Sequence, residues 1–221
     1  MTQGMSREHL RLLEIDPLEM RDPSLFPGYR SVETENAAPA DDAADDAPAS
    51  GQAPCQCSDG PRIDGEGNPH ADWLFVGEAP GAEEERDGRP FVGPSGKLLD
   101  NMLAALGLKR SQVFVTNAVR CRPPENRRPQ VEEIEACRPA LEEEIARVQP
   151  RVIVALGEAA ARSLGLHGSV GDLRGQPQQS DGVPVPVVVT YHPAYLRRMP
   201  AAKRDAWHDL LLARGLLTRA A

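Results

Sequence analysis

Short runs of apolar residues alternate along this chain with longer stretches in which apolar residues recur every three or four positions. The short runs lack the strict alternation of a half-exposed strand, so they predict strands buried on both faces, as in parallel sheets. The longer stretches predict amphipathic helices. The predicted strands are residues 72–76, 113–116, 152–156 and 185–190, and the predicted helices lie near 95–106, 131–148, 158–164 and 201–217.

The alternation of strands and helices predicts an α/β fold with a central, mainly parallel, four-stranded sheet. Pro139 falls inside the helical pattern of residues 131–148 and should kink or split that helix. Residues 168–182 show neither pattern and are expected to form a loop.

The segment 77–93, which follows the first strand, has an unusual composition. It holds four glycines and two prolines in seventeen residues, whereas connections in α/β units usually have about two to six residues. Glycine lets a backbone approach a ligand and proline stiffens the loop. An ordinary acidic connection is the alternative, but the length and composition favour a ligand-binding loop.

Four residues lie just beyond the ends of the predicted strands: Gly77, Asn117, Gly157 and His192. In a parallel sheet they share one edge, which is where open α/β sheets bind ligands. Taken alone, Asn117 is explained by a turn and His192 by an ordinary histidine. Phe91, an aromatic in the glycine-rich loop, suits stacking on a planar ligand, with a core position as its alternative.

Charge is distributed unevenly along the chain. Residues 1–54 carry 4 Lys and Arg against 11 Asp and Glu, a net charge of −7, so the remaining residues account for only −1 of the total of −8. Nucleic acid is therefore not excluded as a partner of the folded part. The basic, proline-rich segment 120–129 suits phosphate contacts, with solvated surface charge as the alternative.

Composition also divides the chain. We expect an N-terminal extension at 1–30 with a short helix, a disordered acidic Ala/Pro-rich linker at 31–54, and one folded domain at 55–221. No apolar run reaches the length of a membrane span, and the N-terminus lacks the apolar region of a signal peptide. These features predict a cytoplasmic protein with no membrane partner. We also expect a monomer, and the sequence does not indicate a partner for the extension.

The chain has four cysteines, Cys55, Cys57, Cys121 and Cys137. Structural disulfides are rare in a cytoplasmic setting. Four thiolates suit a [4Fe–4S] cluster or a structural zinc, and four unrelated free cysteines are the alternative. Their spacing alone does not decide between these possibilities.

Six segments together carry a family resemblance. They are 77–84 (Gly-Glu-Ala-Pro-Gly-Ala-Glu-Glu), 88–93 (Gly-Arg-Pro-Phe-Val-Gly), 116–124 (Thr-Asn-Ala-Val-Arg-Cys-Arg-Pro-Pro), 137–139 (Cys-Arg-Pro), 152–157 (Val-Ile-Val-Ala-Leu-Gly) and 191–196 (Tyr-His-Pro-Ala-Tyr-Leu). In these segments the chain resembles the family 4 uracil-DNA glycosylases, the iron–sulfur branch of that superfamily. The resemblance spans about residues 55–215.

This resemblance implies a three-layer α/β/α sandwich and a monofunctional hydrolase of base excision repair. The enzyme would flip uracil out of DNA and hydrolyse its N-glycosidic bond, leaving an abasic site. By position, Phe91 would stack on uracil, Asn117 would hydrogen-bond its Watson–Crick edge, and His192 would stabilise charge on its O2.

The resemblance implies further roles by position. Glu78, with the backbone amides around Ala79 and Gly81, would line the uracil pocket, and Glu84 would place or activate the water. Contacts with DNA would come from Arg120, Arg122, Arg127, Leu196 and Arg197, of which Leu196 and Arg197 would enter the minor groove.

One [4Fe–4S] cluster per chain is implied as well, held by Cys55, Cys57, Cys121 and Cys137. The family separates its first two ligands by two residues and this chain separates them by one, which leaves open whether both Cys55 and Cys57 ligate. The rival to an enzyme is a non-catalytic, metal-stabilised DNA-binding module. A phosphate-binding α/β enzyme would need a Walker-type Lys-Ser/Thr pair, which this loop lacks.

Overall fold

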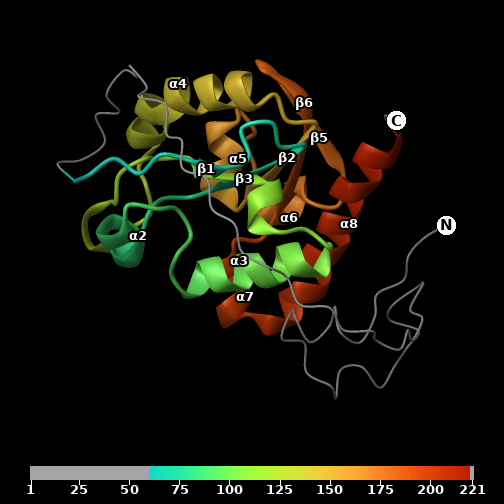
Figure 1. Ribbon diagram of the computed structural model, residues 1–221, viewed down its shortest axis with the longest axis horizontal. Coiled ribbons are helices and arrows are strands. Elements are labelled where there is room, and N and C mark those ends of the chain that lie inside the picture. Colours follow the sequence, from blue (N-terminus) through green and yellow to red (C-terminus); the bar gives the residue numbers. More distant parts are fainter. Residues whose placement is uncertain (1–59, 220–221) are drawn as a thin grey trace.

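The computed structural model describes residues 60–219, which form a twisted sheet with helices on both faces (Figure 1). Its six strands follow the order β1-β3-β2-β4-β6-β5. Their bounds are β1 Glu66–Gly67, β2 Trp73–Gly77, β3 Phe114–Asn117, β4 Val152–Leu156, β5 Pro177–Ser180 and β6 Val183–Thr190. The strands predicted from apolar runs are β2, β3, β4 and β6, which pair in parallel as expected.

The predicted number of strands was wrong because both edge strands lack an apolar run. β1 has two residues and pairs antiparallel with β3, and β5 reads Pro-Gln-Gln-Ser and pairs antiparallel with β6. Each edge strand forms backbone hydrogen bonds with one neighbour and buries none of its side chains, so neither strand has an apolar run. Residues 168–182 accordingly hold a short helix, α6, and β5 instead of the expected loop.

The helices are α2 Ala82–Asp87, α3 Pro94–Ala105, α4 Val131–Val148, α5 Glu158–Ser163, α6 Val170–Leu173, α7 Pro193–Arg198 and α8 Lys203–Arg219, with 3₁₀ turns at Arg110–Gln112, Pro124–Asn126 and Pro200–Ala202. None of these helices is both long and apolar enough to cross a membrane. Pro139 does not split α4, which runs unbroken through it.

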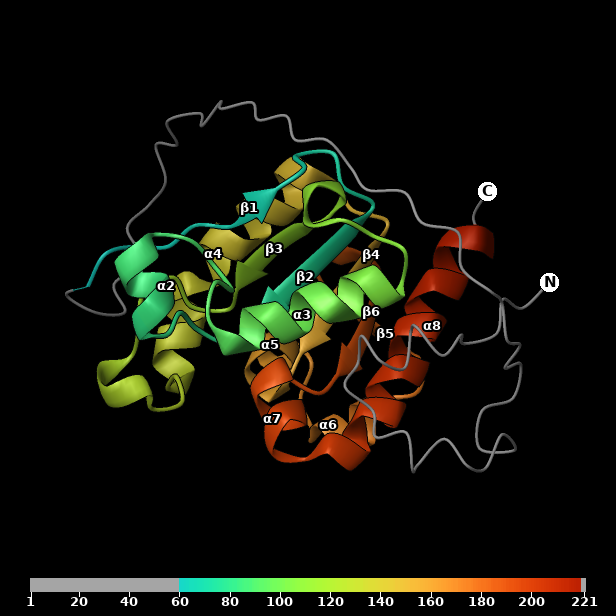
Figure 2. The ribbon, with the colours of Figure 1, turned by 60° about the horizontal axis from the view of Figure 1, so that its bottom comes forward.

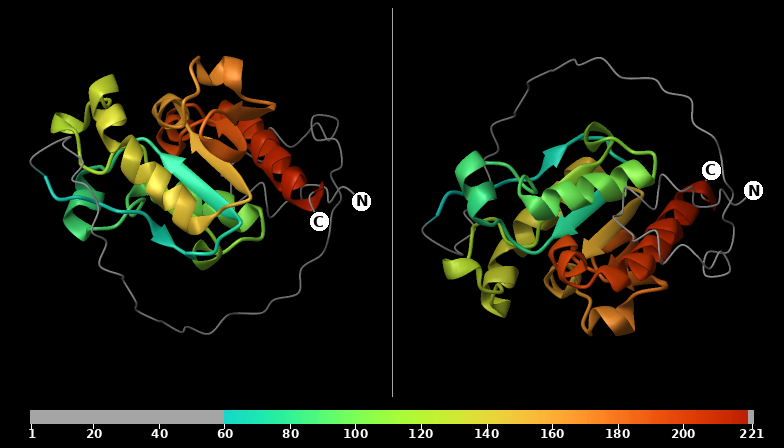
Figure 3. Two further views of the ribbon diagram at one scale, coloured as in Figure 1. Left: turned by 90° about the horizontal axis from the view of Figure 1, so that it is seen from above. Right: turned by 90° about the horizontal axis from the view of Figure 1, so that it is seen from below.

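Alternating residues of the parallel strands pack into two separate hydrophobic clusters. Phe75 and Val154 face α3, α7 and α8, whereas Leu74 and Ile153 face α4 and α5. The opposite views of Figure 3 look onto α4 on one face and onto α3 on the other, and Figure 2 shows α3 lying across the strands. The described residues therefore form a three-layer α/β/α sandwich.

The order of the strands opens a crevice at one edge of the sheet. The chain passes from β2 to β3 through α3 on one face, then crosses back over β2 to reach β4 through α4 on the other face. The segment after β2 leads to α3 on one face, whereas the segment after β4 leads to α5, which packs on the same face as α4. These two segments therefore leave toward opposite faces. Such a switch point is where ligands bind in open α/β sheets.

Candidate active site

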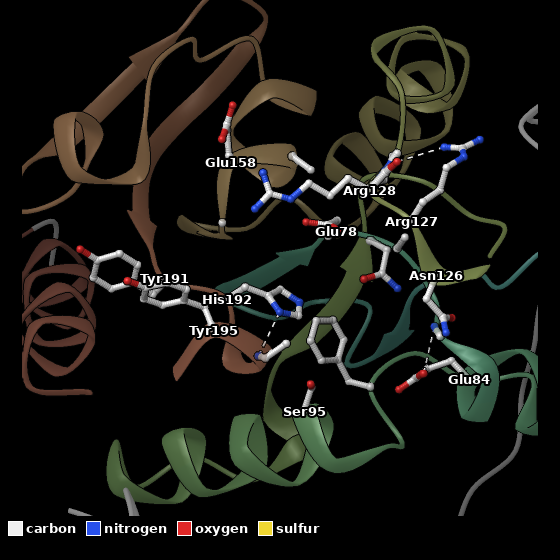
Figure 4. Close-up of a pocket in the computed structure, with 18 of the residues that line it drawn as sticks. Glu78, Glu84, Ser95, Asn126, Arg127, Arg128, Glu158, Tyr191, His192 and Tyr195 are labelled. Atoms are coloured by element: carbon white, nitrogen blue, oxygen red, sulfur yellow. Dashed lines mark hydrogen bonds between the residues drawn. The ribbon is translucent and has the colours of Figure 1, made fainter. Parts of the chain in front are cut away.

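A cleft of about 980 Å³ lies at the carboxyl edge of the parallel strands. It is lined at the strand ends by Glu78 after β2, Asn117 of β3, Gly157 after β4 and His192 after β6. Figure 4 shows Glu78, Glu84 and His192 around this space. The strand ends thus converge, as the sequence predicts for parallel strands.

The predicted site residues divide into two groups. Those that line the cleft are Glu78, Ala79, Gly81, Glu84, Phe91, Asn117, Arg127 and His192. Those that lie elsewhere in the described part of the chain are Arg120, Arg122, Leu196, Arg197, Cys121 and Cys137. Cys55 and Cys57, together with the predicted extension and linker, lie outside the described residues.

Phe91 is held in a backbone conformation that aromatic residues rarely adopt, with φ of 56°. Two glycines accommodate it: a Cβ on Gly77 would overlap the Phe91 ring, and a Cβ on Gly96 would overlap the Phe91 carbonyl. Strained backbone of this kind persists where its surroundings enforce it. Sequence reasoning missed Gly96, whose close approach to Phe91 depends on how α3 docks.

The Glu84 carboxylate closes the glycine-rich loop on itself. One oxygen accepts hydrogen bonds from the backbone N–H of Val92 at 3.1 Å and of Gly93 at 3.0 Å, and the other accepts from Gly81 N–H at 3.0 Å. Both oxygens are therefore engaged by main chain. In this arrangement Glu84 fixes the loop that carries Phe91.

Asn117 ends β3 opposite Gly77 of β2 and is 2% exposed. A Cβ on Gly77 would overlap Asn117 Oδ1 as well as the Phe91 ring, so both side chains pack against the same bare Cα. The Asn117 amide makes no hydrogen bond to another described residue. Its donor and acceptor thus remain available at the cleft.

His192 caps the N-terminus of α7 with its side chain. Its Nδ1 accepts the backbone N–H of Ala194 at 3.1 Å, which leaves the proton of the neutral ring on Nε2. Burial, reinforced by the positive charge of Arg198 and opposed by Glu84, lowers the pKa of His192 to about 4. The ring lies 5.8 Å from the Phe91 ring, centroid to centroid. His192 is therefore a neutral donor beside an aromatic platform.

Arginines surround the mouth of the cleft. Arg127 is paired with Glu133 at 2.7 Å and Arg162 lies 4.0 Å from Glu158. The other two, Arg128 and Arg198, form no ion pair with a described residue, and their charges oppose the burial that raises the pKa of Glu78. Arg128 and Arg198 are thus the cations of this rim that are available to phosphates.

The predicted contact of Arg120 with DNA was wrong. Arg120 is fully buried, where it pairs with Glu144 at 2.7 Å and donates to Thr116. Glu144 also accepts the backbone N–H of Gly65 at 3.0 Å. Arg120 therefore joins β3 and α4 inside the protein. Its sequence position, in a basic loop, gives no sign of an acidic partner 24 residues away.

The prediction that Leu196 enters the minor groove of DNA was also wrong. It is 1% exposed and packs in the hydrophobic cluster with α3 and α8. Arg197 is exposed but does not line the cleft, and Arg122 is paired with Glu85 at 2.9 Å. The exposed apolar side chains here are Tyr195 at 37% and Met199 at 50%, and Tyr195 lines the cleft.

Both described cysteines are in the interior. Cys121 follows the buried Arg120 and is 4% exposed, and Cys137 lies on the inner face of α4 with no exposure. Among residues 60–219, no group of three or more His, Cys, Asp or Glu side chains is arranged to hold a metal ion. A four-thiolate site would need Cys55 and Cys57 in addition.

The fold and the cleft define an α/β enzyme in which a neutral histidine, an aromatic side chain and an amide that bonds no other described residue are grouped at one sheet edge. Residues 65–211 match the family model of the uracil DNA glycosylase superfamily. The chain belongs to this superfamily, and its similarity to curated relatives places it with the type-4 uracil-DNA glycosylases.

Three type-4 uracil-DNA glycosylases illustrate the similarity. The chain is 45% identical over 157 residues to that of Pyrobaculum aerophilum, across 68% of this chain and 80% of the relative. It is 45% identical over 162 residues to that of Sulfurisphaera tokodaii, across 70% and 74% respectively. It is 46% identical over 137 residues to that of Thermotoga maritima, across 61% of this chain and 70% of the relative.

Proposed function

We propose that this protein excises uracil from DNA by hydrolysing the N-glycosidic bond, leaving an abasic site. The observation that carries the proposal is the grouping of His192, Asn117 and Phe91 at one edge of the cleft. A base inside a duplex is inaccessible, so the nucleotide has to rotate out of the helix into this cleft.

Base recognition is assigned to Phe91 and Asn117. The Phe91 ring offers a face on which a planar base stacks. The Asn117 amide, which bonds no described residue, offers one donor and one acceptor to the Watson–Crick edge of uracil. Cytosine would present its N4 amino group where uracil presents O4, so an amide oriented for uracil leaves donor facing donor and rejects cytosine.

His192 is assigned to the leaving base. Uracil departs as an anion while the sugar gains positive charge, so the barrier falls when a donor is aimed at the atom where negative charge develops. The backbone N–H of Ala194 occupies Nδ1, which directs the Nε2 proton to the ligand. We assign that proton to uracil O2. The pKa of about 4 means the ring serves as a neutral donor.

Glu78 and Glu84, two of the carboxylates that line the cleft, have different tasks in this proposal. Glu84 holds the loop through three backbone N–H groups, so most of its acceptor capacity is used by the main chain. The Glu78 carboxylate makes no hydrogen bond to a described residue and lines the same cleft. Glu78 would therefore orient the attacking water and face the positive charge that develops on the sugar.

Contacts with the DNA backbone are assigned to Arg128 and Arg198, which are free of ion pairs within residues 60–219. Phosphate contacts of this kind position the duplex without selecting a sequence. Tyr195, in place of the buried Leu196, is the exposed ring beside the cleft that can occupy the gap left by the rotated nucleotide.

A [4Fe–4S] cluster fits the residues present in part: Cys121 and Cys137 supply two buried sulfurs, and Cys55 and Cys57 would complete the set. When bound, the cluster would cross-link the segment before β1 to the loop after β3 and to α4, which is a structural role in a hydrolysis. The residues of the cleft perform the reaction.

Anaerobically purified protein should contain about four irons per chain, as a Cys₄-ligated [4Fe–4S] centre requires. Cys121→Ala should lose most of that iron, because a ligand is removed from an interior position. Metal analysis of both proteins measures this. One zinc per chain without iron would contradict the cluster. The absence of any metal would contradict both the cluster and a structural zinc at these cysteines.

The function is tested with a duplex oligonucleotide that contains one uracil. Purified protein should release free uracil, detected by chromatography, and should cut the strand only after alkali. No lysine is among the described residues that line the cleft, so no Schiff base is available for strand cleavage. The matched duplex with cytosine should be untouched. Binding without release would favour the non-catalytic module, and strand cleavage without alkali would contradict a monofunctional enzyme.

A further inference from the structure

Asp209 is a fully buried carboxylate that lies on α8 and does not line the cleft. One of its oxygens accepts from Thr190 Oγ1 at 2.8 Å and from Arg174 Nε at 3.1 Å; the other accepts from Arg174 Nη2 at 3.2 Å and from the backbone N–H of Gly175 at 3.1 Å. A buried charge with this many partners ties its neighbours to one arrangement.

The first of these partners, Thr190, is the last residue of β6. It is fully buried, and its carbonyl accepts the backbone N–H of Gly157 at 2.8 Å. The chain after Thr190 continues directly into Tyr191 and His192, which line the cleft. Asp209 therefore anchors the strand end from which the catalytic histidine extends.

The second partner, Arg174, reaches the cleft through an aromatic contact. Its guanidinium lies 5.6 Å from the centroid of the Tyr191 ring, and it also donates to the Asp205 carbonyl at 2.8 Å. Tyr191 in turn stacks on Tyr195, with centroids 5.0 Å apart and an interplanar angle of 21°. The Asp209 ion pair thus supports two stacked rings that lie together on one side of His192 (Figure 4).

We propose that Asp209 is a positioning residue for His192: through Thr190 and Arg174 it holds the segment that aims Nε2 at the leaving base. The inference rests on the proposed function and adds to it a residue remote from the substrate. The position of the His192 ring has to be accurate, because a displacement of about 1 Å in an active site lowers the rate about 100-fold.

The principal test is Asp209→Asn, which keeps the size of the side chain and an oxygen for Thr190 but removes the charge that holds Arg174. The maximal single-turnover rate of uracil release should fall about tenfold, with the affinity for DNA changed less than about threefold. Asp205→Asn is the matched control: it removes a carboxylate 4.0 Å from Arg174 Nη1 and leaves the Asp205 carbonyl in place. Its rate should equal that of the wild type.

Nitrogen NMR of the imidazole separates positioning from general destabilisation. In the wild type, His192 should show a protonated Nε2 and an unprotonated Nδ1, since Nδ1 accepts from Ala194. Asp209→Asn should show a mixture of tautomers or a shifted Nδ1 signal, and Asp205→Asn should not. The protein has 5 histidines, so His192→Ala assigns the signal.

Two outcomes would overturn the inference. One is an Asp209→Asn protein with the maximal rate and the His192 spectrum of the control. The other is a lowered melting temperature with an unchanged maximal rate, which would make Asp209 a packing residue only. If Asp209→Asn does not fold, Arg174→Met tests the inference instead. It keeps the aliphatic volume of a partly exposed side chain. It should also lower the rate of uracil release and alter the His192 spectrum. A wild type that releases no uracil would refute the proposed function, while the His192 spectra would still test the positioning.

Discussion

Replacing His192 by alanine should lower the single-turnover rate of uracil release at least about 100-fold, the usual scale for losing a donor to transition-state charge. The Nε2 proton faces the cleft because Nδ1 is occupied by Ala194. Asn117→Ala should cause a loss of similar size, because it removes the amide assigned to the Watson–Crick edge of uracil. That amide packs beside Phe91 against Gly77.

The control for the histidine is His208→Ala, which removes an exposed imidazole on α8 outside the cleft. Its rate should match that of the wild type, and melting temperatures should show that all three variants are folded at the assay temperature. Wild-type rates for both His192→Ala and Asn117→Ala would remove the assignment of this cleft as the active site.

The pH dependence of the same reaction tests the charge state of His192. Its pKa of about 4 in the folded protein lies below the ordinary 6.5, so the ring stays neutral as the pH falls through 6.5. The rate should therefore be flat with respect to this group across roughly pH 5 to 8. A rate that rises as the pH drops through 6.5, and does so only when His192 is present, would show that the imidazolium is the active form.

The same shift makes a contribution to stability that depends on pH. The unfolded chain takes up a proton on this histidine near 6.5 and the folded protein does so only near 4. The contribution is complete above 6.5 and is lost as the pH falls toward 4.

Gly77→Ala should be nearly as damaging, with a loss of uracil release of at least about 100-fold. The new Cβ would overlap both the Phe91 ring and Asn117 Oδ1. Neither side chain can retreat easily, because the carbonyl of Phe91 packs against Gly96 and Asn117 is 2% exposed. One added methyl group therefore displaces the stacking platform and the recognition amide together.

Gly215→Ala is the matched control, because a Cβ at that position in α8 meets nothing within 4 Å. Its rate should equal that of the wild type. Phe91→Leu provides a second measurement if Gly77→Ala is poorly folded: it removes the aromatic face and leaves Gly77 bare, and it should lower the rate as well. A folded Gly77→Ala with the wild-type rate would contradict the positions assigned to Phe91 and Asn117.

Much of the framework of this site follows from the sequence. Apolar runs identified β2, β3, β4 and β6, and their parallel pairing brings the strand ends to one edge, so Asn117 and His192 were expected to meet. Hydrophobic periodicity is a local signal, which is why it locates strands and helices without knowledge of their neighbours. The family motifs assigned the roles that remain proposals for these residues.

The tertiary structure alone decided which polar side chains pair inside the protein. Arg120 lies in a basic loop by sequence but is neutralised by Glu144 on α4, and Asp209 shows no sequence signal of its bond to Thr190. Leu196 is buried because α7 packs against α3, which no local pattern indicates. The sequence by itself therefore determined the elements and the edge where they meet, since these depend on the period of apolar residues. The structure decided which side chains face the cleft and which are held behind it, since that depends on partners far apart in the chain.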